Sequence, residues 1–263
     1  SCDMAEKYRI KWSREETILA FDLYCKVPFS KISKTNPDII ELADLLGRTP
    51  SAVGLKMANL AHFDRELRAR NVSGMSNASK LDGEIFREFE SDWDGLSYQA
   101  QEIKARLKNT VVENVICDEV AYGIEKLPPG EYREQVMKSR VGQYFFRTAV
   151  LSAYRNRCCV TGILLPELLV ASHIKPWKSS DAKTERTNPS NGLCLNSLHD
   201  KALITIDKNY RIVNSAKISS TAMDYDTKAW FMSYEGKQII LPDRFYPNKA
   251  FIEYHNDMIF PGV

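Results

Sequence analysis

The sequence predicts an α+β protein of two domains, a helical N-terminal domain at residues 1–110 and a C-terminal domain at residues 133–263, joined by a linker at residues 111–132. Three observations lead to this expectation. Helix caps followed by apolar residues at helical spacing dominate the first part of the chain. The segment Pro128-Pro129-Gly130 is a strong break. Short apolar runs between turn residues, typical of strands, fill most of the second part.

The composition is that of an ordinary globular protein. The 263 residues are 44% hydrophobic and 27% charged, with a formal net charge of +2. No apolar run approaches the roughly 20 residues of a membrane span, so we expect no membrane association. The six cysteines are scattered without a framework spacing, which favours reduced thiols in a cytoplasmic protein over the disulfides of a secreted one.

Three helices are predicted in close succession in the N-terminal domain. The first begins near Ser13, because Ser13-Arg-Glu-Glu16 is a capping box. The second begins near Pro37 and ends at Gly47, which suits the left-handed position after a helix end. The third has Thr49 as its cap and Pro50 as its first residue. Its predicted inward face consists of Val53, Met57 and Leu60.

The second and third of these helices, with their glycine turn, have the arrangement of a DNA-binding helix-turn-helix. This arrangement predicts that Arg48, Ser51 and Lys56 contact phosphates or base edges. A plain helical hairpin without a ligand is the alternative, since an exposed Leu55 and a small Ala58 would suit a packed neighbour equally well.

Charge is distributed unevenly along the chain. Residues 82–94 contain six acids and one arginine, whereas residues 138–186 contain nine lysines and arginines and three acids. The basic stretch is a candidate for neutralising DNA phosphates, although such a stretch is also typical of a solvated protein face. The basic residues singled out from it are Arg155, Arg157, Lys175 and Lys178.

In the C-terminal domain, an apolar helix at residues 144–155 precedes a ribbon of two short strands. The first, at residues 168–170, delivers His173 to a turn at Pro176, and the second covers residues 192–195. A helix is predicted to start within residues 196–202. Beyond it we expect a small antiparallel sheet and a short final helix, with strands at residues 204–206, 210–213, 229–232 and 238–241 and the helix near residues 249–255.

Two of the four histidines, His173 and His199, fall in this ribbon and helix. The arrangement brings them close together with an open side. Hydrolysis of a phosphodiester needs a base, a divalent ion that holds the phosphate, and a rigid loop that fixes both. Asn191 can supply the rigidity by bonding loop backbone groups through its amide. The other histidines, His62 and His255, are expected to be structural.

Five motifs in this region together resemble the HNH branch of the ββα-metal nucleases, in the form found in restriction-type endonucleases. They are Phe146-Arg-Thr-Ala-Val150, Arg157-Cys-Cys-Val-Thr-Gly162, Ser172-His-Ile-Lys-Pro-Trp177, Asn191-Gly-Leu193 and Leu198-His-Asp200. The resemblance covers about residues 133–213. It implies that His173 is the general base, that Asn191 orders the loop, and that His199 binds one divalent ion, which would be Mg, Mn, Co or Ni.

The same resemblance implies double-stranded DNA as the substrate and a helical recognition domain ahead of the nuclease. It also implies a homodimer, since one HNH centre cuts one strand at a time.

Two features depart from the family's pattern. Ser172 stands where many relatives carry an acid or a second histidine that binds the metal. Relatives also carry a short segment with Phe-Asp and Gly after the last motif, whereas here residues 200–207 run straight into the next strand. Either Asp200 or Asp207 supplies the missing carboxylate, or the site is damaged. The alternative to an endonuclease is therefore a DNA-binding regulatory protein with a degenerate HNH fold.

Many HNH domains hold a structural zinc ion with two Cys-x-x-Cys pairs. The equivalent segments here are Cys159-Val-Thr-Gly162 and Leu195-Asn-Ser-Leu198, which lack three of the four thiolates. We therefore expect no structural zinc. Cys158, Cys159 and Cys194 are expected to be buried thiols.

Overall fold

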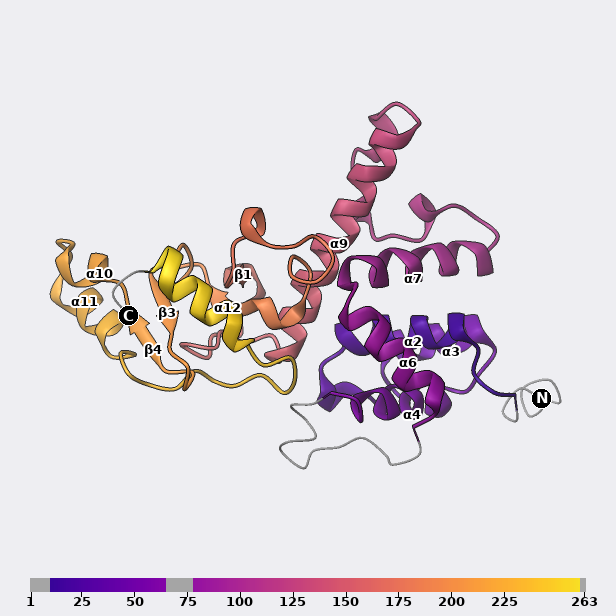
Figure 1. Cartoon of the computed structure of the whole chain (residues 1–263), viewed down its shortest axis with the longest axis horizontal. Helices are drawn as coiled ribbons and strands as arrows, with labels where there is room; N and C mark the ends of the chain where they lie inside the picture. The colour runs from indigo at the N-terminus through magenta and orange to yellow at the C-terminus, as the bar shows by residue number, and fades with distance from the viewer. Residues whose placement is uncertain (1–9, 65–77, 261–263) are drawn as a thin grey trace. The chain divides into compact units, whose positions relative to one another are not determined.

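The computed structural model describes residues 10–64 and 78–260, and its contacts divide the chain into two compact units. Unit 1 comprises Ser1–Ala149 with Ala182–Asn188, and unit 2 comprises Val150–Asp181 with Pro189–Val263. Helices make up the N-terminal region and two small antiparallel sheets lie in the C-terminal region, so the predicted α+β class is confirmed (Figure 1). The segment predicted as a linker, residues 111–132, belongs to unit 1. Among the described residues, no helix is long and apolar enough to cross a membrane.

The capping residues predicted for the first three described helices are found at the expected helix ends. Helix α2 (Arg14–Lys26) follows a complete capping box between Ser13 and Glu16. Helix α3 (Pro37–Leu46) ends at Gly47, which has a φ of 63°. Helix α4 (Pro50–Ala61) begins after Thr49, whose side chain accepts a hydrogen bond from the N–H of Ala52. The remaining helices of this part of the chain are α6 (Lys80–Glu90), α7 (Trp93–Leu107), α8 (Asp118–Ala121) and α9 (Glu131–Ala153).

Helix α2 lies at the centre of unit 1 and packs against α3, α4, α6 and α7. The Phe21 ring centroid is 4.9 Å from that of Phe86 and 6.0 Å from that of Trp93. A second apolar cluster explains why α9 begins well before residue 144, where the apolar run predicted its start. Met137 and Val141, on the first half of α9, are buried against residues of the predicted linker.

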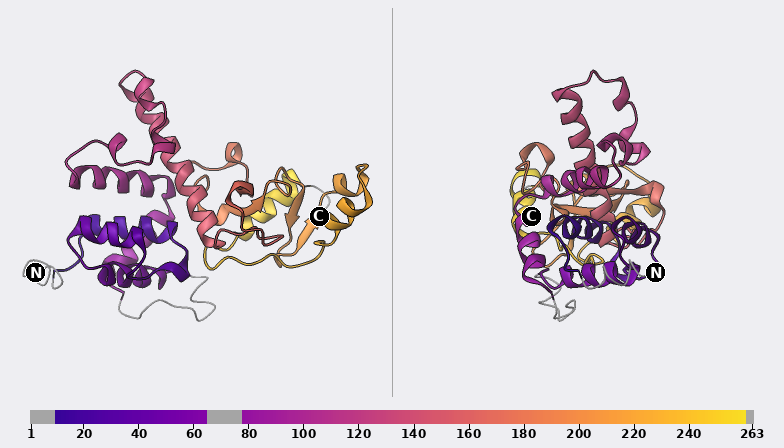
Figure 2. Two further views of the ribbon diagram at one scale, coloured as in Figure 1. Left: turned by 180° about the vertical axis from the view of Figure 1, so that it is seen from behind. Right: turned by 90° about the vertical axis from the view of Figure 1, so that its right-hand side faces the viewer.

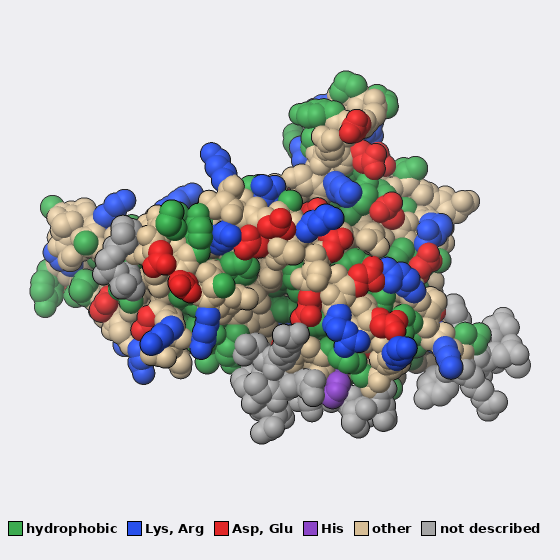
Figure 3. All heavy atoms as spheres, viewed as in Figure 1, with side chains coloured by type: hydrophobic (Ala, Val, Ile, Leu, Met, Phe, Trp, Pro, Cys, Tyr) green, Lys and Arg blue, Asp and Glu red, His purple; other side chains and the backbone are tan. Residues whose placement is uncertain are grey.

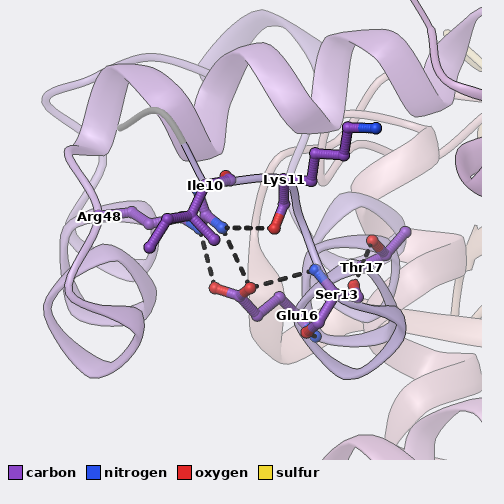
Figure 4. Close-up of polar contacts among 6 residues, drawn as sticks. All are labelled: Ile10, Lys11, Ser13, Glu16, Thr17 and Arg48. Carbon is purple, nitrogen blue, oxygen red and sulfur yellow. Dashed lines mark hydrogen bonds and ion pairs between the residues drawn. The ribbon is translucent and has the colours of Figure 1, made fainter. Parts of the chain in front are cut away.

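A buried ion pair ties the first turn of α2 to the turn between α3 and α4. Arg48 donates from Nε to Oε2 of Glu16 over 2.8 Å and from Nη1 to the carbonyl of Ile10 over 3.2 Å (Figure 4). Its guanidinium carbon lies 4.4 Å from the ring centroid of Trp12, and the Nζ atom of Lys56 lies 5.2 Å from the same centroid. Both cations therefore pack on one indole ring, where cation–π attraction adds to their ion pairs.

Unit 2 contains two separate two-stranded antiparallel sheets. Strand β1 (Leu169–His173) pairs with β2 (Gly192–Asn196), and β3 (Ile204–Ile206) pairs with β4 (Ile212–Asn214). Three short helices follow, α10 (Ala216–Ser220), α11 (Tyr225–Met232) and α12 (Lys249–Tyr254). A π-helical turn, His255–Ile259, continues α12. Figures 1 and 2 show α12, in yellow, alongside the orange strands.

Three predicted elements of unit 2 differ in the structure. Residues 197–203 form turns in place of the predicted helix, and Lys201 and Ala202 adopt φ values of 62° and 58°. Residues 229–232 belong to α11 and form no strand, because Asp224 caps that helix through the N–H of Thr227. The predicted strand at residues 238–241 reduces to a single bridge, between Arg211 and Gln238.

His199 lies in an aromatic cluster formed with α11 and the turn that follows it. Its ring centroid is 5.1 Å from that of Trp230, 5.2 Å from that of Phe231 and 5.7 Å from that of Tyr234. The side chain is 1% exposed, and its Nε2 atom is buried without a hydrogen bond. Burial lowers the pKa of His199 to about 4.

The first prediction compares a buried ion pair with an exposed one. Arg48→Ala leaves Glu16 without its cation in a site that is 15% exposed, so the free energy of unfolding should fall by ~3 kcal/mol. Arg14→Ala removes the Arg14–Glu88 pair, whose side chains are 50% and 42% exposed, and should cost less than ~1 kcal/mol. Chemical denaturation of both variants measures the two costs. Equal costs would contradict the structural role given to Arg48.

The second prediction concerns stability against pH. An unfolded histidine titrates near ~6.5, so below that pH the unfolded chain binds a proton that the folded His199, with its pKa of about 4, excludes. The free energy of unfolding should therefore fall between about pH 6.5 and 4, by up to ~1.4 kcal/mol per pH unit from this group. His199→Phe keeps a ring in the cluster but cannot bind the proton. Thermal melts should show a weaker pH dependence for this variant, and an unchanged one would contradict the burial of a neutral His199.

Candidate active site in the C-terminal unit

A cavity of about 410 Å³ opens in unit 2 between β1, β3 and the C-terminal π-helical turn. Polar side chains from four separate segments of the chain line it. They are Ser172 and His173 from β1, Asp200 and Lys201 from the turn after β2, Thr205 from β3 and His255 from the π-helical turn.

His173 is the last residue of β1 and pairs in register with Gly192, the first residue of β2. Its half-buried ring meets the ring of Trp177 edge-on, with the centroids 5.8 Å apart and an angle of 86° between the planes. The imidazole therefore lies where the hairpin ends, on the wall of the cavity. A group in that position can accept a proton from a water molecule bound inside.

Asn191 fixes the loop that follows His173. Its Oδ1 accepts a hydrogen bond from the backbone N–H of Lys175 over 2.8 Å, and its Nδ2 donates to the carbonyl of the same residue over 3.1 Å. The backbone carbonyl of Asn191 also accepts from the N–H of Ile174 over 3.0 Å. Because the Asn191 side chain is fully buried, water does not compete for these bonds. We refer to the two side-chain bonds as the Asn191 clamp.

Asp200 is the carboxylate of the cavity. Its Oδ1 accepts a hydrogen bond from the hydroxyl of Ser172 over 2.8 Å. Ser172, the residue before His173, therefore contacts one of the two acids that the sequence suggested as the missing carboxylate. The other acid suggested by the sequence, Asp207, accepts hydrogen bonds from the N–H groups of Asn209 and Arg211 in the turn between β3 and β4. Asp207 does not line the cavity.

The donors on the cavity wall suit an open metal site. Within residues 10–64 and 78–260, no three His, Cys, Asp or Glu side chains lie close enough together to hold a metal ion. A closed site built from protein ligands alone is therefore not present there. One carboxylate beside a hydroxyl fits a hard cation that keeps several water ligands and completes its shell with substrate phosphate.

The structure does not bring His199 to this cavity. His199 and Asp200 are neighbours in sequence, but only Asp200 lines the cavity, whereas the His199 ring lies in the aromatic cluster. The short connection between β2 and β3 explains the separation. Without the predicted helix, the two side chains leave a tight turn in different directions.

The predicted DNA-contacting residues fall into two groups. Arg48 and Lys56 are 6% and 5% exposed and are held in ion pairs with Glu16 and Asp82, so the structure gives them a structural role in place of the predicted DNA contact. Ser51 is exposed on α4.

Four basic residues predicted to contact DNA belong to unit 2. Lys178 is exposed, while Lys175 is partly covered, with its Nζ atom 4.9 Å from the ring centroid of Tyr254. Arg155 donates to the carbonyl of Leu241 over 3.3 Å, and Arg157 is half-buried. The face shown in Figure 3 has basic and acidic side chains intermingled, with no broad basic surface.

Hydrogen bonds hold the segment where related domains carry a zinc-binding pair. The Sγ atom of Cys158 accepts from the N–H groups of Val160 and Thr161, each over 3.4 Å, and from Nδ2 of Asn196 over 3.2 Å. Burial by itself would raise the pKa of the Cys158 thiol, but the hydrogen bonds from Thr161 and Asn196 outweigh it and lower that pKa. Cys159 and Cys194 are buried thiols, as expected.

His255 lines the same cavity as His173, and sequence reasoning missed it. Nothing near the C-terminus marks it, because its partner Thr205 lies 50 residues earlier in the chain. The one available signal was the scarcity of histidine, of which the chain has only four.

One comparison with known proteins matches the segment that carries β1 and β2. A family model described as HNH endonuclease matches residues 158–205, a range that contains β1, β2, His173, Asn191 and Asp200. No protein of curated function matches the chain. HNH endonucleases hydrolyse phosphodiester bonds in DNA and generally use one divalent metal ion. The match therefore supports nuclease activity for the segment that carries β1, β2 and Asp200, whereas Ile206, His255 and Ile259 of the cavity wall lie outside it.

Proposed function

We propose that the chain is a metal-dependent DNA endonuclease of the HNH type in which His173 is the general base. The Asn191 clamp is the observation that carries the proposal. It fixes the backbone directly after His173, on the wall of a cavity that also holds a carboxylate. Phosphodiester hydrolysis needs this pairing of a positioned base and an anionic group that attracts a cation.

The proposed reaction consumes one water molecule per bond cleaved. His173 accepts a proton from water as the water oxygen attacks phosphorus. The bond between phosphorus and one bridging oxygen breaks, and that oxygen leaves with a proton from solvent. The Asn191 clamp fixes the loop that follows His173 and so keeps the imidazole in position during this step.

Asp200 is the proposed metal ligand, with Ser172 holding the carboxylate in place. A divalent ion bound there would neutralise charge on the phosphate and stabilise the leaving oxygen. A carboxylate with water ligands suits Mg or Mn better than Co or Ni, which favour nitrogen ligands.

The helical N-terminal region is proposed to select the DNA, in the manner of a restriction-type enzyme. The α3–α4 arrangement and the exposed Ser51 on α4 support this role, while Arg48 and Lys56 contribute to the stability of the region. A homodimer would place two such cavities on one duplex, which would allow both strands to be cut.

A DNA-binding regulatory protein without catalysis is the second candidate. The position of His199 favours it, because the imidazole that the family uses as a metal ligand is enclosed among aromatic rings. DNA binding without cleavage under any metal condition would distinguish this candidate.

The third prediction tests the base. His173→Ala should lower the rate of plasmid cleavage by about 10²- to 10⁴-fold, as expected for loss of a general base. The assay is run with Mg, Mn, Co and Ni on unmodified and modified DNA, and His62→Ala serves as a matched control that should cleave like the wild type. Failure of the wild type to cleave any of these substrates would refute the nuclease proposal. Equal cleavage by His173→Ala would refute only the assignment of the base.

The fourth prediction tests the metal ligand. Asp200→Asn keeps the size of the side chain but removes its charge, so the affinity for Mn²⁺ should fall at least tenfold. Electron paramagnetic resonance of free Mn²⁺ measures this without any cleavage. Asp226→Asn, at an exposed position on α11, removes the same charge elsewhere and should leave the affinity unchanged. Equal affinities for the two variants would exclude Asp200 as the ligand.

A further inference from the structure

The sequence predicted a structural role for His255, but in the structure this residue lies on the wall of the nuclease cavity. The histidine is 9% exposed, it lines the nuclease cavity, and it begins the π-helical turn after α12. A π-helical turn is rare and is frequently found at functional sites. The second imidazole of the cavity wall is therefore His255, whereas His199 lies in the aromatic cluster.

A chain of hydrogen bonds determines which nitrogen of His255 carries the proton. Asn256 donates from Nδ2 to the carbonyl of Ile206 over 3.1 Å, which orients its amide and leaves Oδ1 as an acceptor. The Thr205 hydroxyl donates its only hydrogen to that Oδ1 over 2.6 Å. Thr205 Oγ1 can then only accept from Nδ1 of His255, which lies 2.7 Å away.

The proton of a neutral His255 therefore resides on Nδ1. Its Nε2 carries the lone pair, and this is the polar group that the ring can present to the cavity. Burial lowers the pKa of His255, while the hydrogen bond with Asn256 opposes that shift. The neutral form is consequently favoured. A base whose other nitrogen is held by a hydrogen bond has a fixed tautomer and orientation, as in the oriented bases of hydrolases.

We propose that His255 is a second catalytic residue of the nuclease cavity, where its Nε2 accepts a hydrogen bond from the attacking water. Thr205 is the positioning residue that fixes its tautomer. This inference rests on the proposed nuclease function. One hydrogen of the water is transferred to His173. The other stays on the water oxygen and is hydrogen-bonded to Nε2 of His255, so a lone pair of the water oxygen faces phosphorus. The proton balance of the hydrolysis is unchanged.

The fifth prediction follows from this role. His255→Ala should lower kcat for plasmid cleavage by at least about tenfold, because a positioned proton acceptor contributes about 10²-fold or more when it carries the whole transfer. KM for DNA should stay within twofold. Thr205→Val should lower kcat in the same way, and Thr205→Ser, which restores the hydroxyl, should recover it. Glu253→Ala, at an exposed position on α12, is the matched control and should cleave like the wild type.

Chemical rescue separates a base from a space-filling ring. Imidazole added to His255→Ala should restore cleavage, whereas pyrazole, which has nearly the same shape but is a much weaker base, should not. Equal rescue by both compounds, or cleavage by His255→Ala equal to that of Glu253→Ala, would overturn the proposal. His255→Gln provides the same kinetic comparison with a polar side chain of similar length if the alanine variant fails to fold.

A second readout does not depend on cleavage. Long-range ¹H–¹⁵N spectra of the wild type in EDTA should show the His255 proton on Nδ1, and Thr205→Val should change that tautomer. A short DNA duplex added in EDTA should shift the Nε2 signals of His173 and His255 together. A proton found on Nε2 of His255, or a shift confined to His173, would overturn the role of His255. Absence of cleavage by the wild type, in contrast, would refute the nuclease function itself.

Discussion

The placement of the proposed base depends on the Asn191 clamp. A two-stranded ribbon such as β1–β2 is marginally stable by itself, and its open end is where His173 lies. The clamp closes that end by joining the first residue before β2 to the loop after β1. Replacing the amide would remove the acceptor of the Lys175 N–H and one of the donors to the Lys175 carbonyl, which also accepts from the Ser180 hydroxyl over 3.1 Å. In a buried site this costs more than the loss of an exposed hydrogen bond.

The length of the connection between β2 and β3 decides which side chains reach the cavity. With no helix in residues 197–203, the chain turns directly from the end of one sheet into the next. Asp200 then lines the cavity and joins Ser172, while His199 is turned into the aromatic cluster beside α11. The same motif residues thus acquire different surroundings from those that a longer connection would give them. A second imidazole on the cavity wall comes instead from His255, which is distant in sequence.

The elements that could be predicted from the sequence are those determined locally. Ser13, Gly47 and Thr49 mark helix ends through contacts within a few residues: α2 begins after Ser13, α3 ends at Gly47 and α4 begins after Thr49. Likewise the two strands were predicted from their short apolar runs, and His173 is the last residue of β1 while Asn191 directly precedes β2.

The failures have long-range causes. Arg48 looked available to DNA because Glu16, its partner, lies 32 residues away. The strand expected at residues 229–232 contains alternating apolar residues, but in the structure its Trp230 and Phe231 pack around His199 from a helix. The helix expected after Asn196 fails because the next strand begins too soon. For Arg48 a distant partner overrides the local pattern, and for residues 229–232 these packing contacts add to the local cap by Asp224.

The turn after Asp200 carries backbone strain of its own. Lys201 and Ala202 are successive non-glycine residues with φ values of 62° and 58°, and a left-handed conformation costs such residues roughly 1–2 kcal/mol each. The rest of the unit must hold the turn against this preference. Local opening of the turn would release this strain. The acid of the cavity is therefore next to a strained turn, whereas the base lies at the end of a hydrogen-bonded hairpin.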